Sequence, residues 1–163
     1  MSKETRKDRV LALVFFFVSV GGVTSVLAGS RILAWIAIVV SDLYLLSTLL
    51  FAAMRSDDES LLHRHAWIAD FFPRRAAGVL VVVLLFVAVL SGFAGLYVGT
   101  EVFSSNKTPL DAFYISVFTL AFTDYSPKAG YGQIVVMTQV VSGVLLLVAL
   151  FPLLISRIST FKN

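Results

Sequence analysis

The sequence has no cysteine, only two histidines and few charged side chains. The absence of cysteine excludes disulfides, thiolate metal sites and thiol catalysis. Charged residues make up 14% of the chain, whereas a typical soluble domain has about a quarter. The formal net charge of +3 is too small to indicate a nucleic-acid partner. The composition therefore argues against a soluble domain and against a strongly basic, nucleic-acid-binding one.

Catalytic motifs are also lacking. His63 and His65 lie together in one polar link, and the sequence has no H-E-x-x-H motif. No nucleophile is accompanied by a base and an orienting group. We predict that the protein is not an enzyme, and that it has no cofactor, no nucleic-acid partner and no small-molecule substrate. The histidines are interpreted as solvated loop residues, with a pH-sensing role as the alternative.

The chain is instead rich in long apolar runs. Hydrophobic residues make up 58% of it, and the mean hydropathy is +0.91. A helix needs about 20 residues to cross a hydrocarbon core about 30 Å thick. The runs that reach this length are residues 10–28, 32–54, 76–98 and 134–155. We predict an all-α integral membrane protein with four transmembrane helices, the first of which is retained rather than cleaved as a signal peptide.

Basic residues predict the orientation of these helices. They are concentrated before the first run, between the second and third runs, and after the fourth. Because Lys and Arg favour the cytoplasmic side, we predict that both termini are cytoplasmic, in a plasma membrane or a cell inner membrane. Residues 60–72, which include Trp67, have apolar positions at helical spacing and predict a short amphipathic interfacial helix. On the opposite side, Gly29, Ser30 and Arg31 predict a tight hairpin between the first two helices.

A fifth apolar segment, residues 110–122, is too short to cross the membrane and suits a re-entrant helix. Thr108 is a candidate N-cap, Pro109 fits the first helical turn, and Asp111 stands where a capping box has Glu. Pro127 ends the helical pattern. Irregular chain at membrane depth is tolerated only where protein buries it or where it lines a watery cavity. Because one four-helix subunit encloses little space, we expect several copies around an axis.

The stretch DAFYISVFTLAFTDYS, from Asp111 to Ser126, resembles the pore helix and filter of the tetrameric potassium-channel superfamily. In that family, D-A-x-Y-x-S-V-x-T-L precedes T-x-G-Y-G, and the residues that match this opening are Asp111, Ala112, Tyr114, Ser116, Val117, Thr119 and Leu120. The resemblance covers about half of the chain. It implies a homotetramer with an outer helix at residues 76–98, an inner helix at 134–155 and an ion pathway lined near Thr119 and residues 122–126.

The apolar runs, the charge pattern and the resemblance together predict an organisation into four parts. Residues 1–54 would be a transmembrane hairpin, 55–75 an interfacial linker, 76–156 the ion-channel pore module and 157–163 a short cytoplasmic tail. The hairpin would form a peripheral belt around the pore. Gly143 takes the place of the family's gating-hinge glycine, and Pro152 is a second hinge candidate because proline kinks or breaks helices. Close helix packing explains Gly143 equally well.

The filter itself departs from the family pattern. Aligned without gaps, T-V-G-Y-G falls on Phe122, Thr123, Asp124, Tyr125 and Ser126, so only the tyrosine survives. The family's filter presents a column of backbone carbonyls to the ion, and its glycines adopt backbone conformations that other residues resist. We therefore expect an incomplete carbonyl ladder and a weakly selective or non-selective cation channel.

The residues that replace the filter allow two interpretations. In a tetramer, Asp124 would form a ring of carboxylates that binds monovalent cations near Thr123, with K⁺, Na⁺ or Ca²⁺ as permeant ions. Lys128 would pair with Asp124 or oppose cation entry. Four Phe122 rings would either constrict the pore or turn back into the surrounding helices. The alternative function is a non-conducting membrane scaffold or regulatory subunit that retains the pore architecture.

Asp42 is an acid in the middle of the second apolar run, where a charge is costly and is a functional candidate by default. A structural hydrogen bond is the simpler interpretation, and a role in conduction is the alternative. The partners that we expect are an Arg of a neighbouring helix or the hydroxyl of Thr24, Tyr44 or Ser47.

On the last run, Gln139 and Ser142 either line a cavity or hold helices together.

Overall fold

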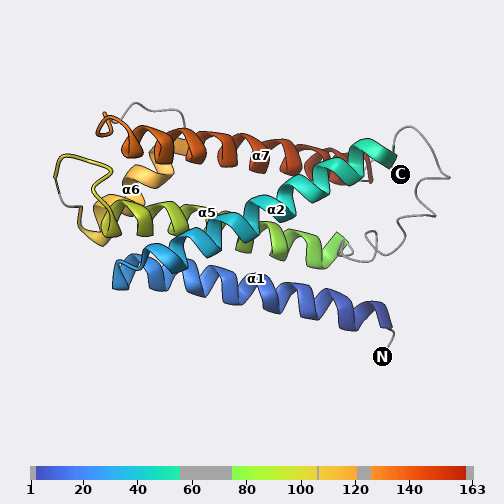
Figure 1. The fold of residues 1–163 in the computed structure, drawn as a ribbon. Coiled ribbons are helices and arrows are strands. Elements are labelled where there is room, and N and C mark those ends of the chain that lie inside the picture. The colour runs from blue at the N-terminus through green and yellow to red at the C-terminus, as the bar shows by residue number, and fades with distance from the viewer. Residues whose placement is uncertain (1–2, 56–74, 106, 121–125, 161–163) are drawn as a thin grey trace.

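The computed structural model describes residues 3–55, 75–105, 107–120 and 126–160 (Figure 1). Within these ranges the chain forms helices and no strands. The helices are α1 (Lys3–Ala28), α2 (Arg31–Arg55), α5 (Arg75–Gly99), α6 (Pro109–Leu120) and α7 (Tyr131–Thr160). The predicted interfacial helix at residues 60–72, with His63 and His65, lies outside the described residues.

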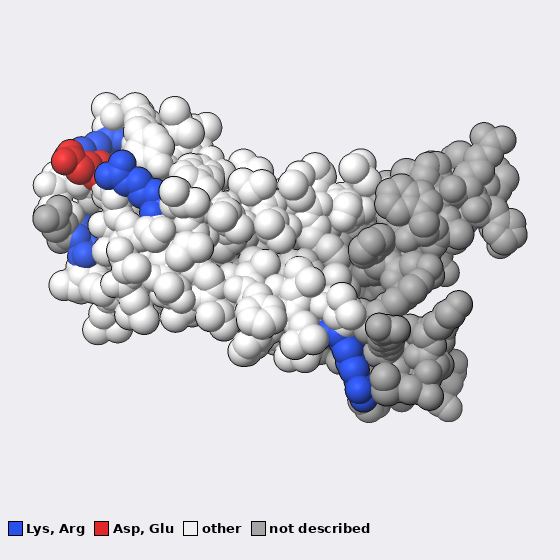
Figure 2. All heavy atoms as spheres, turned by 60° about the horizontal axis from the view of Figure 1, so that its bottom comes forward, with Lys and Arg blue, Asp and Glu red and all other residues white. Residues whose placement is uncertain are grey.

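Four of these helices are long and apolar enough to cross a membrane. Their apolar segments are Arg9–Ala28, Arg31–Leu50, Leu80–Gly99 and Tyr131–Val148. On the face shown in Figure 2, the charged side chains of the described residues lie toward the two ends of the molecule and leave an uncharged middle. The prediction of an all-helical integral membrane protein with four spanning helices is confirmed at this level.

The last helix begins earlier than predicted, at Tyr131. Gly130 just before it has a φ of 81°, and its N–H donates to Oε1 of Gln133 (3.3 Å), so the first turn has a side-chain partner. Hydropathy alone misses this start because the turn is polar. α7 then continues without a break through Pro152 to Thr160.

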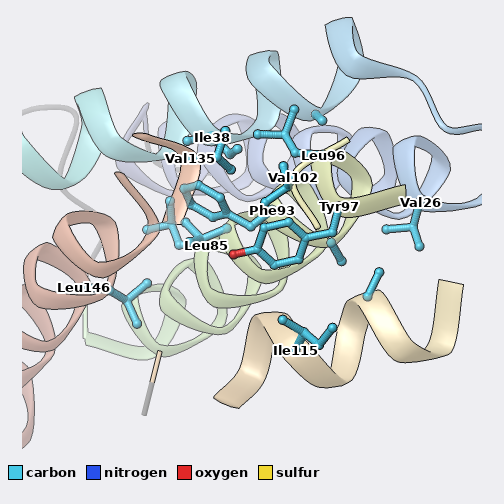
Figure 3. Packing of buried hydrophobic residues seen from close by; sticks show 14 of the residues in the cluster. Val26, Ile38, Leu85, Phe93, Leu96, Tyr97, Val102, Ile115, Val135 and Leu146 are labelled. Carbon is cyan, nitrogen blue, oxygen red and sulfur yellow. The ribbon is translucent and has the colours of Figure 1, made fainter. Parts of the chain in front are cut away.

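α5 is the central helix and contacts α1, α2, α6 and α7. Its C-terminal half is buried continuously over residues 88–97, and Phe93, Leu96 and Tyr97 form much of the core (Figure 3). In a membrane, helices associate through close packing rather than through the hydrophobic effect, so small residues favour their contacts. Gly92 packs against Ala34 and Ile38 of α2, where a Cβ atom would come within 2.8 Å of the Ile38 side chain.

Small residues also bring α1 and α5 together. A Cβ atom added at Gly22 or Gly95 would overlap a serine of the opposite helix, and one added at Gly99 would overlap the backbone of Gly29 in the turn after α1. The pairs are Gly22–Ser91, Ser25–Gly95 and Gly29–Gly99. Because the residue numbers rise together in these pairs, α1 and α5 run parallel. The resulting interface leaves no room for larger side chains.

The predicted hairpin between α1 and α2 is confirmed. Gly29 has a φ of 61°, the left-handed conformation that favours glycine, and α2 begins two residues later at Arg31. Arg31 Nε donates to the carbonyl oxygen of Gly99 (2.6 Å), which ties the turn to the end of α5. We call this end of the bundle the hairpin end. The start of α1 and the end of α7 lie at the opposite end, and α6 lies toward the hairpin end between α5 and α7 (Figure 1).

Candidate functional site

The start of α6 is fixed by its cap. The N–H of Asp111 donates to Oγ1 of Thr108 (3.2 Å), and the N–H of Ala112 donates to the Thr108 carbonyl (2.9 Å). The Thr108 hydroxyl in turn donates to Oδ2 of Asp111 (2.6 Å). The carboxylate therefore meets the threonine hydroxyl, whereas a standard capping box would place it on the backbone N–H. Pro109 occupies the first helical position, where its missing N–H costs nothing.

A buried hydrogen-bond network holds the middle of α6 against both of its neighbours. Ser116 Oγ donates to the Leu90 carbonyl of α5 (2.9 Å). Nε2 of Gln139, on α7, donates to the carbonyl oxygen (2.6 Å) and to Oγ (2.9 Å) of Ser116. The Tyr97 hydroxyl of α5 donates to Oε1 of Gln139. The side chains of Ser116, Tyr97 and Gln139 are buried, and we call them the anchor cluster.

The anchor cluster lies deep within the bundle. Gln139 is about 12 Å along α7 from Tyr131, and Leu90 is about 13 Å along α5 from Gly99, at a rise of 1.5 Å per residue. These distances are close to half of a hydrocarbon core about 30 Å thick. An unpaired polar group at such a depth costs several kcal/mol, so the mutual pairing of these groups is what allows polar side chains there.

Thr119, one turn beyond Ser116, differs from the anchor cluster. Its side chain is buried beside Tyr97, and its hydroxyl makes no hydrogen bond of full geometry among the described residues. Thr119 thus places a buried hydroxyl near the C-terminal end of α6, directly before the predicted filter.

The opposite face of α6 is apolar and exposed. Tyr114 and Phe118 lie one turn apart with their ring centroids 4.3 Å from each other. The exposed hydrophobic side chains of this helix are Leu110, Phe113, Tyr114, Val117 and Phe118. α6 is therefore two-sided, with polar anchors on the face toward α5 and α7 and an apolar surface on the other.

After α6, the chain has returned to the hairpin end of the bundle at Lys128. The N–H of Lys128 donates to the Val102 carbonyl (2.8 Å), and its Nζ lies 2.8 Å from Oε2 of Glu101. The bond with Lys128, its positive charge and the more distant charge of Arg31 lower the pKa of the exposed Glu101 carboxyl. Gly132, near the start of α7, also packs closely against the backbone at Val102. A Cβ atom at Gly132 would be 2.6 Å from the Val102 carbonyl oxygen. Sequence reasoning missed Glu101, and the salt bridge gives Lys128 a partner other than Asp124.

The predicted filter is only partly within the described chain. Ser126 is exposed at the beginning of the segment that leads to α7. Phe122, Thr123, Asp124 and Tyr125 lie outside the described residues, and so does the predicted cation site. The hinge candidates both lie within α7, where Gly143 is buried and Pro152 does not interrupt the helix.

The structure gives Asp42 a partner that we did not predict. Ser142 Oγ, on α7, donates to Oδ2 of Asp42 (2.6 Å) and is also 3.0 Å from the Thr138 carbonyl. Among the expected partners, Ser47 Oγ instead donates to the Tyr44 carbonyl on its own helix. The expectation was wrong because sequence spacing identifies neighbours on one helix but not the register between α2 and α7. Gln139 and Ser142 both hold helices together.

Comparison with protein-family models, with curated proteins and with solved structures finds no match to this chain. The functional interpretation therefore depends on the chemistry and the placement of α6. Its main features are a capped start, a buried polar anchor at about half depth, a buried hydroxyl near its end and an apolar outer face. No group of three or more potential metal ligands occurs among the described residues.

Proposed function

We propose that the protein is a weakly selective or non-selective cation channel that assembles as a homotetramer. In each subunit, α5 would serve as the outer helix, α6 as the pore helix and α7 as the inner helix. The hairpin of α1 and α2 would surround this module. Residues 122–126 of the four subunits would line the ion pathway at the axis.

The observation that carries the proposal is the anchoring of α6 by Ser116 at about half the depth of the bundle. The helix begins at Pro109 and reaches the anchor cluster inside, whereas the backbone of Lys128 is bonded to Val102 near the hairpin end. A segment that enters a membrane and leaves on the same side needs protein or water around it. Neighbouring subunits would supply that surrounding.

The electrostatics of α6 also favour cations. The C-terminal end of a helix carries a partial negative charge from its unpaired carbonyl groups. This end of α6 precedes Thr123 and Asp124, the residues that resemble the filter. Four such helix ends and four Asp124 carboxylates around one axis would attract cations and allow them to pass while partly hydrated.

The exposed face of α6 supports an assembly of several chains. Tyr114, Val117 and Phe118 project away from α5 and α7 of their own subunit. In the proposed tetramer they would pack against the inner helix of a neighbour. This packing would close the wall behind the pathway.

Ion flux from liposomes tests the proposal. Protein reconstituted in liposomes is expected to pass K⁺ or Na⁺, and Asp124→Asn should reduce this flux at least several-fold. Glu101→Gln is the matched control, because it removes a different acid, which is exposed near the hairpin end, and it should retain most of the flux. Absence of flux in properly assembled protein would overturn conduction and favour the non-conducting scaffold.

A further inference from the structure

Asp42 is an acid at the middle of a spanning helix. It lies about 16 Å along α2 from Arg31, close to half of a hydrocarbon core about 30 Å thick. Its Oδ2 accepts a hydrogen bond from Ser142 of α7, whereas its Oδ1 is buried and has no hydrogen-bond partner among the described residues. The carboxyl group is thus only half satisfied, at a depth where an ionised acid is costly.

No cation compensates this acid in the described part of the chain. Side chains are described for residues 9–50, 80–105, 107–119 and 126–148. Within these residues, the titratable groups on α2 and on the helices packed against it, other than Asp42 itself, are Arg9 on α1, Arg31 and Tyr44 on α2, Tyr97 on α5 and Tyr131 on α7. Arg31 is bonded to Gly99 at the hairpin end, and Tyr97 is bonded to Gln139 in the anchor cluster. Arg9 begins the apolar segment of α1, near the opposite end. None of these groups forms an ion pair with Asp42.

We propose that Asp42 is a proton-binding site that connects the α1–α2 hairpin to α7. At neutral pH the carboxyl group would hold its proton on Oδ1 and accept the Ser142 hydrogen bond on Oδ2. Loss of the proton would leave a carboxylate that needs water or a cation on Oδ1. Oδ1 is buried, and Oδ2 of the same carboxyl group is bonded across the α2–α7 contact. We therefore expect the two helices to separate locally to admit either one.

The place of Ser142 gives this site a link to the proposed channel. Ser142 directly precedes Gly143, the hinge candidate of α7, and is itself bonded to the Thr138 carbonyl one turn before. A change in the Asp42–Ser142 contact would therefore act on α7 next to Gly143. Only this link to gating rests on the proposed function; proton binding by Asp42 does not.

Infrared spectroscopy of the reconstituted protein tests proton binding directly. A protonated, membrane-buried carboxyl group absorbs apart from ionised carboxylates, and we expect such a band in the wild type at neutral pH. Asp42→Asn, which is nearly isosteric, should remove the band. Ser142→Ala should keep the band but shift its frequency, because one hydrogen bond is lost. Asp111→Asn, an exposed acid in the cap of α6, is the matched control and should leave the band unchanged.

Each outcome decides between the alternatives. A solvated aspartate is ionised above about pH 4, so a wild type without the band at neutral pH would overturn the proposal. Persistence of the band in Asp42→Asn would also overturn it, since another acid would then be the source. A band that Na⁺ abolishes at constant pH would identify a metal-cation site in place of a proton site. None of these results depends on ion flux.

A second measurement tests the connection between the helices. Because the chain lacks cysteine, spin labels can be attached through cysteines placed at Leu43 on α2 and Val141 on α7, both of which are exposed. We expect the distance between the labels to increase or broaden at alkaline pH, as the infrared band disappears. In Asp42→Asn the distance should stay constant over the same pH range. The same alkaline change in Asp42→Asn would overturn the connection.

Discussion

Two interfaces of α5 illustrate two ways of joining helices inside a membrane. Toward α1, the contact is made mainly by glycine and serine, which bring the backbones together, and Ser19 Oγ adds a hydrogen bond to the Leu84 carbonyl (2.7 Å). Toward α6, the contact depends on the anchor cluster, where a serine, a tyrosine and a glutamine satisfy one another. Close packing suits a permanent helix pair. A polar anchor suits a short helix that must stop at one depth.

The difference follows from what each helix must achieve. α1 spans the bundle beside α5 along much of its length, so many small contacts add up. α6 has only twelve residues and ends within the bundle, so it is too short to make as many packing contacts. Directional hydrogen bonds at depth supply position instead, because their loss leaves buried polar groups unpaired. Substitutions at the two interfaces should therefore destabilise the protein for different reasons. At the α1–α5 interface the cause is steric overlap, and at the α5–α6 interface it is the loss of hydrogen bonds.

The largest effect is expected from Gly95→Leu, at the close-packed interface. Even a Cβ atom there would overlap Ser25 of α1, so the two helices must separate. We expect a loss of about 3 kcal/mol in the free energy of unfolding, at the upper end of typical overpacking costs. Denaturation in detergent micelles measures it. Gly21→Leu is the matched control on α1, because a Cβ atom at Gly21 meets no atom within 4 Å, and a similar loss there would contradict the packing account.

At the polar interface, Gln139→Leu should cost about 2 kcal/mol, since it removes the buried partner of the Tyr97 hydroxyl and of the Ser116 carbonyl. Ion flux should fall as well, because α6 would lose its anchor. Thermal unfolding and flux assays on the same preparation measure the two effects. Thr138→Val, on the same helix, removes only a hydroxyl bonded to its own Ile134 carbonyl and should change neither quantity appreciably. Normal stability of Gln139→Leu would show that the anchor cluster does not hold α6.

A smaller effect is expected at the start of α6. Thr108→Ala removes the side-chain cap, which is typically worth about 1 kcal/mol. Thr108→Ser should restore most of the loss, because it retains the hydroxyl that accepts from the Asp111 N–H. Amide hydrogen exchange in the first turn of α6 is the most local measurement. Equal exchange rates in the alanine and serine variants would argue against the cap.

The smallest effect concerns the exposed pair of Glu101 and Lys128. Because Lys128 lowers the pKa of Glu101 below the ordinary value of 4.5, the pair stabilises the folded state at neutral pH. This contribution is lost as the pH falls through the lowered pKa of Glu101. Glu101→Gln should thus have a slightly lower Tm than the wild type at neutral pH, and the difference should vanish on acidification. High salt should also reduce it.

The fold could be predicted from sequence where the signal is local. Apolar run length identified the four spanning helices, the Gly29 turn identified the hairpin, and the pattern around Pro109 identified where α6 begins. The polar contacts could not be predicted in the same way. Asp42 with Ser142, Tyr97 with Gln139 and Glu101 with Lys128 each join residues far apart in the chain. Their pairing depends on the register between helices, which periodicity within one helix does not contain.

The number of chains in the assembled protein tests the central claim most directly. One subunit has too few helices to enclose an ion pathway beside α6, so the proposed channel requires copies arranged around an axis. Native mass spectrometry from detergent micelles or lipid nanodiscs measures this number. We predict a complex of four chains, and a protein that remains monomeric in a lipid bilayer would contradict the claim.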